Sequence, residues 1–325
     1  MFSALGLILV AVLWVTKPWV RSFEINAEVS DLLDQRKHIV GILPILEKKE
    51  YITPKKEKDR LDILILGIRG DGEEEPEAGS YLTDTLMVLS VDKNTGETGL
   101  ISIPRDLYVK MPYLNKKDKI NAAYAYSAGS KDSGLAGVKT LVSQITGIYI
   151  DYAVLFDFEA FRGLVDTVGG VDVSLAVPFE EGLQWGSSSF YLPAGENHLD
   201  GEAALYYARS RFSTSDFDRS RRQQEIIFAL KEKMVSLGFL TNPRKINSTL
   251  DTIKQHIRTD IQLWDINDLI KVASAINKVG AGNINTFVIH SENLVYETKQ
   301  NGIYILVPNE NTFAGIREKF KTILQ

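Results

Sequence analysis

The stretch that decides the fold runs from Tyr152 to Leu175 and reads YAVLFDFEAFRGLVDTVGGVDVSL. Residues 152–156 form a short apolar run typical of a buried strand, and Asp157 follows as a helix N-cap residue. A stripe at helical spacing comes next, and Gly169-Gly170 ends the helix before a second strand at residues 171–175. The stripe consists of Phe158, Phe161, Leu164, Val165 and Val168. Strands that alternate with helices predict a layered α/β domain.

Three more strands are predicted upstream, two of them joined by a tight turn. Residues 61–67 read as a buried strand, and residues 85–91 and 99–103 as the next two. The intervening Asp92-Lys93-Asn94-Thr95-Gly96-Glu97 has the composition of a hairpin turn. An antiparallel hairpin beside βα units makes the expected sheet a mixed one.

The hairpin also predicts which residues meet at one edge of the sheet. If the loop is residues 93–96, counting outward along the antiparallel pair places Asp84 opposite Arg105. Pro104 cannot donate to the ladder, so Arg105 and Asp106 should turn out into a loop there. The pair could be a structural ion pair. With a phosphate ligand, it could instead be a magnesium ligand beside an oxyanion clamp, because Mg²⁺ prefers one or two carboxylates plus phosphate oxygens.

Five arginines fall within the fourteen residues 209–222. Residues 206–211 read as a strand, which would place Arg209 and Arg211 on one face. Residues 218–236 read as a helix whose apolar stripe extends toward its N-terminus through polar side chains that should face inward. The apolar part is Ile226, Leu230, Met234 and Leu237, and the polar part is Arg219, Arg222 and Gln223.

Arginines in the first turns of a helix are unfavourable unless an anion is bound there, and guanidinium groups grip phosphate oxygens in bidentate fashion. The cluster therefore predicts an anion site. The alternative is a solvated basic helix face with salt bridges to Asp216, Asp218 and Glu225. Arg221, which lies off the stripe, is expected to be such a solvated charge.

Composition limits the other function classes. The chain has 325 residues, 44% hydrophobic content and a net charge of -5, which argues against a general nucleic-acid binder. The absence of cysteine excludes disulfides, thiol catalysis and cysteine-ligated metal. The four histidines have no metal-ligand spacing, and no Gly-x-Ser-x-Gly elbow is present.

The termini suggest a division of the chain into four parts. Residues 1–21 begin with an apolar run and are expected to be an uncleaved membrane anchor, although the run is short for a span and a buried helix is the alternative. Residues 22–60 have linker composition, and the globular part begins at residue 61.

Residues 239–325 are expected to pack on the main domain as an extension, a separate binding module being the alternative. Helices are expected at 250–257 and 266–279, strands at 286–290 and 303–307, and a loop at 293–302.

Several motifs, taken in order, resemble those of the LytR-CpsA-Psr family. They are Leu64-Ile65-Leu66-Gly67, Thr83-Asp84-Thr85, Ser102-Ile103-Pro104-Arg105-Asp106, Lys119-Ile120-Asn121-Ala122-Ala123-Tyr124, Val165-Asp166-Thr167-Val168-Gly169-Gly170-Val171, Arg209-Ser210-Arg211 and Asp218-Arg219 with Arg222-Gln223-Gln224. The resemblance places the catalytic domain at residues 61–238. It implies a three-layer α/β/α sandwich with a mixed central sheet and an apolar tunnel for a lipid.

The resemblance also implies a function at the outer face of the cell membrane. Members are single-pass, extracytoplasmic phosphotransferases that move anionic glycopolymers from a polyprenyl-pyrophosphate carrier to peptidoglycan. A polyprenyl-phosphate-binding scaffold and a lipid pyrophosphatase remain alternatives.

Residue roles follow from the same resemblance. Asp84 resembles the family's magnesium ligand, and Arg105 the arginine that contacts the pyrophosphate, with Asp106 orienting it. The head group would be held by Arg209, Arg211, Arg219 and Gln223, with Lys119 assisting and Arg222 on the same inward stripe. Asp84 or Asp106 could act as the general base.

The chain departs from the family pattern at one position. Arg69 stands where a second acidic magnesium contact is often found, and Asp71 or one of the acids at 73–75 would have to substitute.

Overall fold

The computed structural model describes residues 54–70, 81–111, 114, 116–128, 134–182, 184, 189–237, 253, 255–261 and 284–325. The predicted anchor, most of the predicted linker, Asp71 and the acids at 73–75 lie outside these residues. So does the predicted helix 266–279. Among the helices that the structure does describe, none is both long and apolar enough to cross a membrane.

A six-stranded mixed sheet forms the middle of the molecule, with the strand order β11-β6-β1-β2-β3-β12. Its strands are β1 (Arg60–Gly67), β2 (Thr85–Asp92), β3 (Thr98–Ser102), β6 (Tyr152–Phe156), β11 (Ile257–Thr259) and β12 (Ile284–Val288). β1 pairs antiparallel with β2 and parallel with β6, and β12 pairs parallel with β3. The predicted mixed sheet is therefore confirmed.

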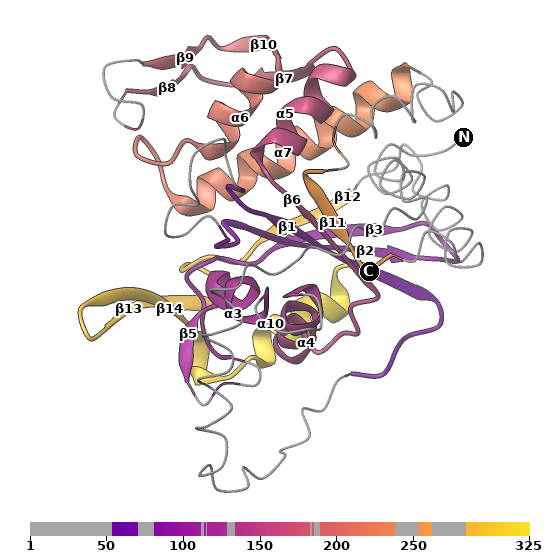
Figure 1. The fold of residues 1–325 in the computed structure, drawn as a ribbon, viewed down its shortest axis with the longest axis vertical. Helices are drawn as coiled ribbons and strands as arrows, with labels where there is room; N and C mark the ends of the chain where they lie inside the picture. The colour runs from indigo at the N-terminus through magenta and orange to yellow at the C-terminus, as the bar shows by residue number, and fades with distance from the viewer. Residues whose placement is uncertain are drawn as a thin grey trace, which may run out of the picture.

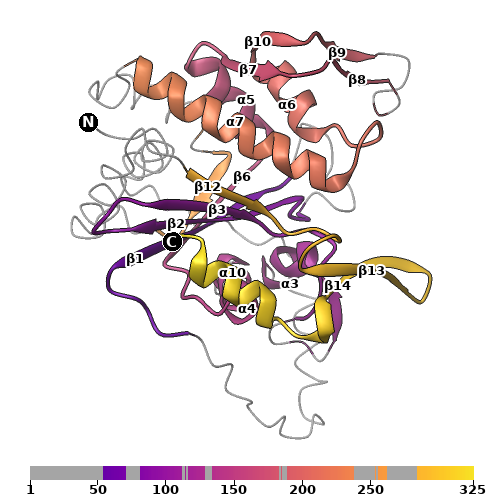
Figure 2. The ribbon, with the colours of Figure 1, turned by 180° about the vertical axis from the view of Figure 1, so that it is seen from behind.

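Helices cover both faces of this sheet (Figure 1). One layer contains α5 (Phe158–Thr167), α6 (Gly201–Arg209) and α7 (Asp216–Ser236). The other contains α3 (Ala123–Ala128), α4 (Gly134–Thr146) and α10 (Ala314–Thr322), as the view from behind also shows (Figure 2). The α/β/α sandwich is thus confirmed.

Strand β1 shows how the sequence pattern produces these layers. Leu64 and Leu66 belong to the hydrophobic core shared with α3, α4 and α10, whereas Leu61 and Ile63 belong to the core on the opposite face. Side chains alternate between the faces of a strand, so a continuous apolar run is buried only when both faces are covered. The run at 61–67 therefore requires two helical layers.

The stretch 152–175 folds largely as its sequence predicts. β6 and α5 occupy the expected positions, and the carboxylate of Asp157 caps α5 by accepting a hydrogen bond from the Ala160 amide at 2.9 Å. Gly169 and Gly170 both have positive φ, which suits the residues that end a helix. The second strand, β7 (Val171–Leu175), pairs with β10 (Gly195–Leu199) in a separate small sheet rather than in the central one.

Short strand pairs and turns complete the fold. They are β4 (Tyr108–Lys110) with β5 (Lys117–Lys119), β8 (Phe179–Glu181) with β9 (Phe190–Leu192), β13 (Val295–Gln300) with β14 (Ile303–Pro308), and the 3-10 turns at Ile120–Ala122 and Asn309–Asn311. The prediction of a loop at 293–302 was wrong, since β13 occupies most of this range. Its polar residues fit a strand because they are largely exposed in the hairpin.

The predicted strand at 206–211 was also wrong, because its first residues form the end of α6. Asp200 caps this helix by accepting a hydrogen bond from the Ala203 amide at 2.8 Å. Gly201, Ala204, Leu205 and Ala208 are all buried, which is the i, i+3, i+4, i+7 spacing of a helix face and does not fit the alternation of a strand. Helix α7 was predicted nearly in full, but Leu237, assigned to its buried stripe, lies beyond the helix end and is exposed.

The segment from residue 239 onward contributes to the central sheet itself. β11 and β12 are the two edge strands of the central sheet. Residue 257, which was predicted to end a helix, instead begins β11. Half of the residues of that predicted helix lie outside the described residues.

Candidate active site

The β2–β3 hairpin brings Asp84 and Arg105 together at one edge of the sheet. The register pairs Met87 with Ser102 and Val91 with Thr98, so Asp84 falls opposite Arg105 as predicted. Nη1 of Arg105 donates to Oδ1 of Asp84 at 2.6 Å. The first of the two predicted groupings is therefore formed, and it lies just beyond the strand ends.

The α6–α7 connection brings the second grouping to the same place. Arg209 is the last residue of α6, Arg211 follows it, and Arg219 lies in the first turn of α7. Nη2 of Arg219 donates to the backbone carbonyl of Asp84 at 3.1 Å. This bond joins two segments that are 135 residues apart in the chain.

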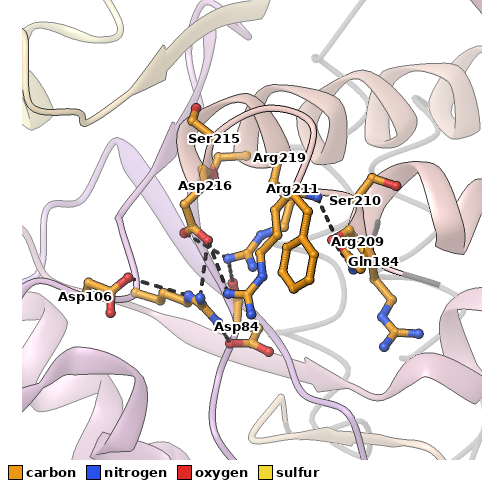
Figure 3. Close-up of polar contacts among 12 residues, drawn as sticks. Asp84, Asp106, Gln184, Arg209, Ser210, Arg211, Ser215, Asp216 and Arg219 are labelled. Carbon is orange, nitrogen blue, oxygen red and sulfur yellow. Dashed lines mark hydrogen bonds and ion pairs between the residues drawn. The ribbon is translucent and has the colours of Figure 1, made fainter. Parts of the chain in front are cut away.

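Asp216, the first residue of α7, lies at the centre of the cluster (Figure 3). Its carboxylate is 3.0 Å from Nη2 of Arg219, 3.4 Å from Nη2 of Arg105 and 4.0 Å from Nη1 of Arg211. An acidic residue here also suits the positive end of the helix dipole. Asp216 thus holds the guanidinium groups of Arg105, Arg211 and Arg219 close to one another.

A cavity of about 280 Å³ lies between the sheet and the layer of α5, α6 and α7. Its charged and polar lining consists of Arg69, Asp84, Thr85, Arg105, Gln184, Arg209, Arg211, Arg219 and Gln223. The apolar lining includes Ile65, Met87, Val154, Phe156, Phe161, Leu164, Leu205, Ile227, Leu230 and Ile257. The cavity is therefore amphipathic, with five arginines beside an extended apolar wall.

The charges in the cluster are crowded and partly desolvated. Burial lowers the pKa of Arg219, and repulsion from Arg105 and Arg211 adds to the effect. Burial and the neighbouring Arg69 likewise lower the pKa of Arg209. Burial acts in the same direction on Arg105, but attraction by Asp216, Asp84 and Asp106 outweighs it and raises its pKa.

All five guanidinium groups nevertheless stay charged, because arginine does not lose its proton in proteins. Among the described residues, the carboxylates of Asp84, Asp106 and Asp216 lie within 4.0 Å of Arg105, Arg211 or Arg219. In addition, Nε of Arg105 and Nε of Arg219 are buried without a hydrogen-bond acceptor among the described residues. A bound anion could accept hydrogen bonds from these unused donors and would be attracted by the crowded guanidinium groups.

Three of the residues predicted for the site contact it from outside the cavity lining. Oδ2 of Asp106 is 3.6 Å from Nε of Arg105, and its Oδ1 accepts a 2.5 Å hydrogen bond from Lys119. Arg222 is turned toward α6, where Nε donates to the carbonyl of Tyr207 at 3.0 Å. Arg221 is exposed and pairs with Asp218, as predicted for a solvated charge.

Sequence reasoning did not assign Asp216, Gln184 or Arg69 to the anion site. Asp216 was considered only as a salt-bridge partner on a solvated face, although its spacing from Arg219 was a usable signal. Gln184 is brought in by its bonds to the backbone of Arg209 and Arg211. Nothing in the local sequence around Gln184 indicates that contact.

Comparison with known proteins agrees with this geometry. The model of the LytR_cpsA_psr family matches residues 33–322. The chain belongs to this family. The match extends well beyond the motifs quoted above, which lie between residues 64 and 224, and includes β11, β12 and α10.

Two curated LytR-CpsA-Psr proteins, both named polyisoprenyl-teichoic acid--peptidoglycan teichoic acid transferase TagU, are similar over most of their length. The one from Halalkalibacterium halodurans is 30% identical, over 86% of this chain and 84% of the relative. The one from Bacillus subtilis (strain 168) is 26% identical, over 94% of this chain and 89% of the relative. The crystal structure of B. subtilis TagV superposes with a TM-score of 0.61 at 29% identity, covering 82% of this chain and 98% of that one.

Family membership also raises the question of a magnesium ion. Asp84 has a half-exposed carboxylate that lines the cavity among the arginines, so it could supply one hard oxygen ligand next to a bound phosphate. No cluster of three or more acidic or histidine side chains suited to a metal is found among the described residues. The donor set thus fits an ion that takes its other ligands from phosphate and water, and Asp84 would hold it.

Proposed function

We propose that this protein transfers an anionic glycopolymer from a polyprenyl-pyrophosphate carrier to peptidoglycan, with the help of magnesium. The observation that carries the proposal is the cavity, which combines five arginines with a long apolar wall. A polyprenyl pyrophosphate has the same two parts, a multiply charged head group and an apolar tail. The names of the TagU relatives support glycopolymer transfer in particular.

In this reaction a sugar hydroxyl of the acceptor attacks the phosphorus atom that carries the glycopolymer. A new phosphorus–oxygen bond forms, the bond to the bridging oxygen breaks, polyprenyl phosphate departs and the hydroxyl proton passes to solvent. Negative charge on the phosphate oxygens is neutralised by Arg105, Arg209, Arg211 and Arg219, which are already held in place before substrate binds. Magnesium, when bound at Asp84, would supply further charge neutralisation.

The acidic residues have distinct roles in this proposal. Asp84 is the acidic residue among the described ones that lines the cavity, so it is placed to contact substrate. Asp216 bridges three arginines and Asp106 is bonded to Lys119, so both position cations rather than accept a proton. We place Lys119 in the same supporting group, acting on Arg105 through Asp106.

The proposal is tested in two steps with the full chain in detergent. Mass spectrometry of gently extracted protein should identify a polyprenyl phosphate or pyrophosphate, and a consistent lack of such a lipid would count against the cavity assignment. The chain is then incubated with a lipid-pyrophosphate glycan, magnesium and peptidoglycan oligomers. Glycan on peptidoglycan supports transfer, free glycan phosphate would indicate a pyrophosphatase, and lipid binding with neither product would indicate a scaffold.

The apolar wall gives a separate prediction. Ile227 on α7 lines the cavity, and Ile227→Trp would fill the space that the lipid chain needs. We expect affinity for a long polyprenyl phosphate to fall about 5- to 150-fold, since overpacking costs about 1–3 kcal/mol. Ile303→Trp is the matched control because Ile303 is exposed in the β13–β14 hairpin. Equal affinities for both variants in a binding titration would argue against a lipid in this cavity.

A further inference from the structure

A buried carboxylate that has no part in the proposed chemistry lies behind the arginine cluster. Glu181, the last residue of β8, has no exposed surface. Its Oε2 accepts hydrogen bonds from the backbone amides of Phe212 at 2.9 Å and Ser213 at 3.0 Å, and from the Ser213 hydroxyl at 3.2 Å. Burying a carboxylate is costly unless such bonds compensate for the lost water. The carboxylate must therefore bind the α6–α7 connection closely.

Gln184 extends this contact to the two arginines of the same connection. Its Oε1 accepts a hydrogen bond from the Arg211 amide at 2.8 Å, and its Nε2 donates to the Arg209 carbonyl at 3.0 Å. The backbone amide of Gln184 in turn donates to Oε1 of Glu181 at 3.3 Å. Figure 3 shows Gln184 next to the backbone of Arg209 and Ser210, on the side away from Asp106.

Arg222 holds the same connection from its carbonyl side. Its Nε donates to the Tyr207 carbonyl at 3.0 Å, its Nη2 donates to the Ser210 carbonyl, and the same nitrogen reaches the Thr214 hydroxyl at 3.2 Å. The guanidinium group also packs 4.8 Å from the ring centre of Phe179, which precedes Glu181 on β8. A cation at the C-terminal carbonyls of a helix is the favourable arrangement.

Together these side chains satisfy the backbone groups that a helix end leaves open. Arg222 bonds the backbone carbonyls of residues 207 and 210, and Gln184 bonds the carbonyl of residue 209 and the amide of residue 211. Glu181 bonds the amides of residues 212 and 213, and Gln223 donates to the Ala208 carbonyl at 3.2 Å. The last carbonyls of a helix normally need water or a C-cap motif. Here the Glu181 carboxylate accepts from two of the amides and the Arg222 guanidinium group donates to two of the carbonyls, while the neutral side chains of Gln184 and Gln223 bond the rest.

We propose that Glu181 and Arg222 are positioning residues that fix residues 209–213, and through Arg209 and Arg211 set the protein's preference for a phosphate head group. This inference rests on the proposed function, because it assumes that these two arginines bind the head group. It also gives Arg222, one of the arginines predicted to bind pyrophosphate, a different role. Arg222 acts through the backbone and does not contact the ligand.

The test measures head-group preference directly. Two ligands of equal chain length, a polyprenyl pyrophosphate and the uncharged polyprenol, are titrated against the full chain in detergent. For Glu181→Ala we expect affinity for the pyrophosphate to fall at least about tenfold, because a misplacement of about 1 Å of a binding group can cost as much as 100-fold. Affinity for the polyprenol should change less than about twofold, since Glu181 itself does not line the cavity.

Glu181→Gln is the conservative variant. Its amide oxygen can still accept from Phe212 and Ser213, so it should retain the pyrophosphate preference to within about threefold. A general loss of structure would instead lower affinity for both ligands in both variants, together with the unfolding temperature. That outcome would overturn the positioning role.

A double-mutant cycle provides an independent check. In the background of Arg211→Ala, the effect of Glu181→Ala on pyrophosphate affinity should shrink, because part of the effect of Glu181 passes through Arg211. Full additivity would overturn the inference. A wild-type chain that binds neither ligand would count against the proposed function instead, so the two failures are distinguishable.

Discussion

Replacing Arg105 with alanine is expected to lower the rate of glycopolymer transfer by about 100- to 1,000-fold, the usual cost of removing one preorganised donor from an oxyanion site. Arg105 lines the cavity, is bonded to Asp84 at 2.6 Å and lies 3.4 Å from Asp216. Its loss removes a positive charge from the place where the phosphate oxygens would lie. The rate is measured as labelled glycan that appears on peptidoglycan oligomers.

Arg221, an arginine of α7 that does not line the cavity, provides a matched control. Arg221→Ala removes the same charge from α7, but Arg221 is exposed and paired with Asp218 outside the cavity. Its rate should stay within about twofold of the wild type, because exposed ion pairs contribute little. If Arg105→Ala were as active as Arg221→Ala, Arg105 would have no role in the reaction.

The second large effect is expected for Asp84→Asn. The amide oxygen can still accept the hydrogen bond from Arg105, so the local structure should persist, but the charged oxygen ligand for magnesium is lost. We expect the transfer rate to fall about 100-fold, since a metal ion supplies several kcal/mol of charge stabilisation. The magnesium concentration needed for half-maximal rate should rise in parallel.

Asp172→Asn is the control for this change of charge. Asp172 is exposed and pairs with His198 and Lys233, outside the cavity lining. The magnesium titration of this variant should match that of the wild type. An unchanged titration for Asp84→Asn would overturn the metal assignment, and a wild-type rate that does not depend on added magnesium would overturn the proposed cofactor.

The meeting of Asp84 and Arg105 could be predicted from sequence because only local rules were needed. A short turn sets the register of a hairpin, and the register then determines which residues face each other along both strands. Helix α7 was predictable for a similar reason, since its buried residues recur at helical spacing. In both cases the informative residues lie close together in the chain.

The failures involve segments whose pattern fits more than one structure. Alternating residues at 206–211 suit a strand, but the N-cap at Asp200 and the packing of Ala204 and Ala208 determine a helix. Strand β13 was missed because its side chains are mostly exposed and therefore show no apolar periodicity. Such segments take their structure from neighbours elsewhere in the fold.

The sequence by itself determined the layered α/β class, the hairpin register and the presence of arginines suited to an anion. Only the tertiary structure decided which of these arginines share a site. Asp216 holds Arg105, Arg211 and Arg219 beside one cavity, whereas Arg222 turns away to the backbone of α6. Periodicity specifies the face of a helix on which a side chain lies. The group that it meets there depends on non-local packing, which a one-dimensional pattern does not encode.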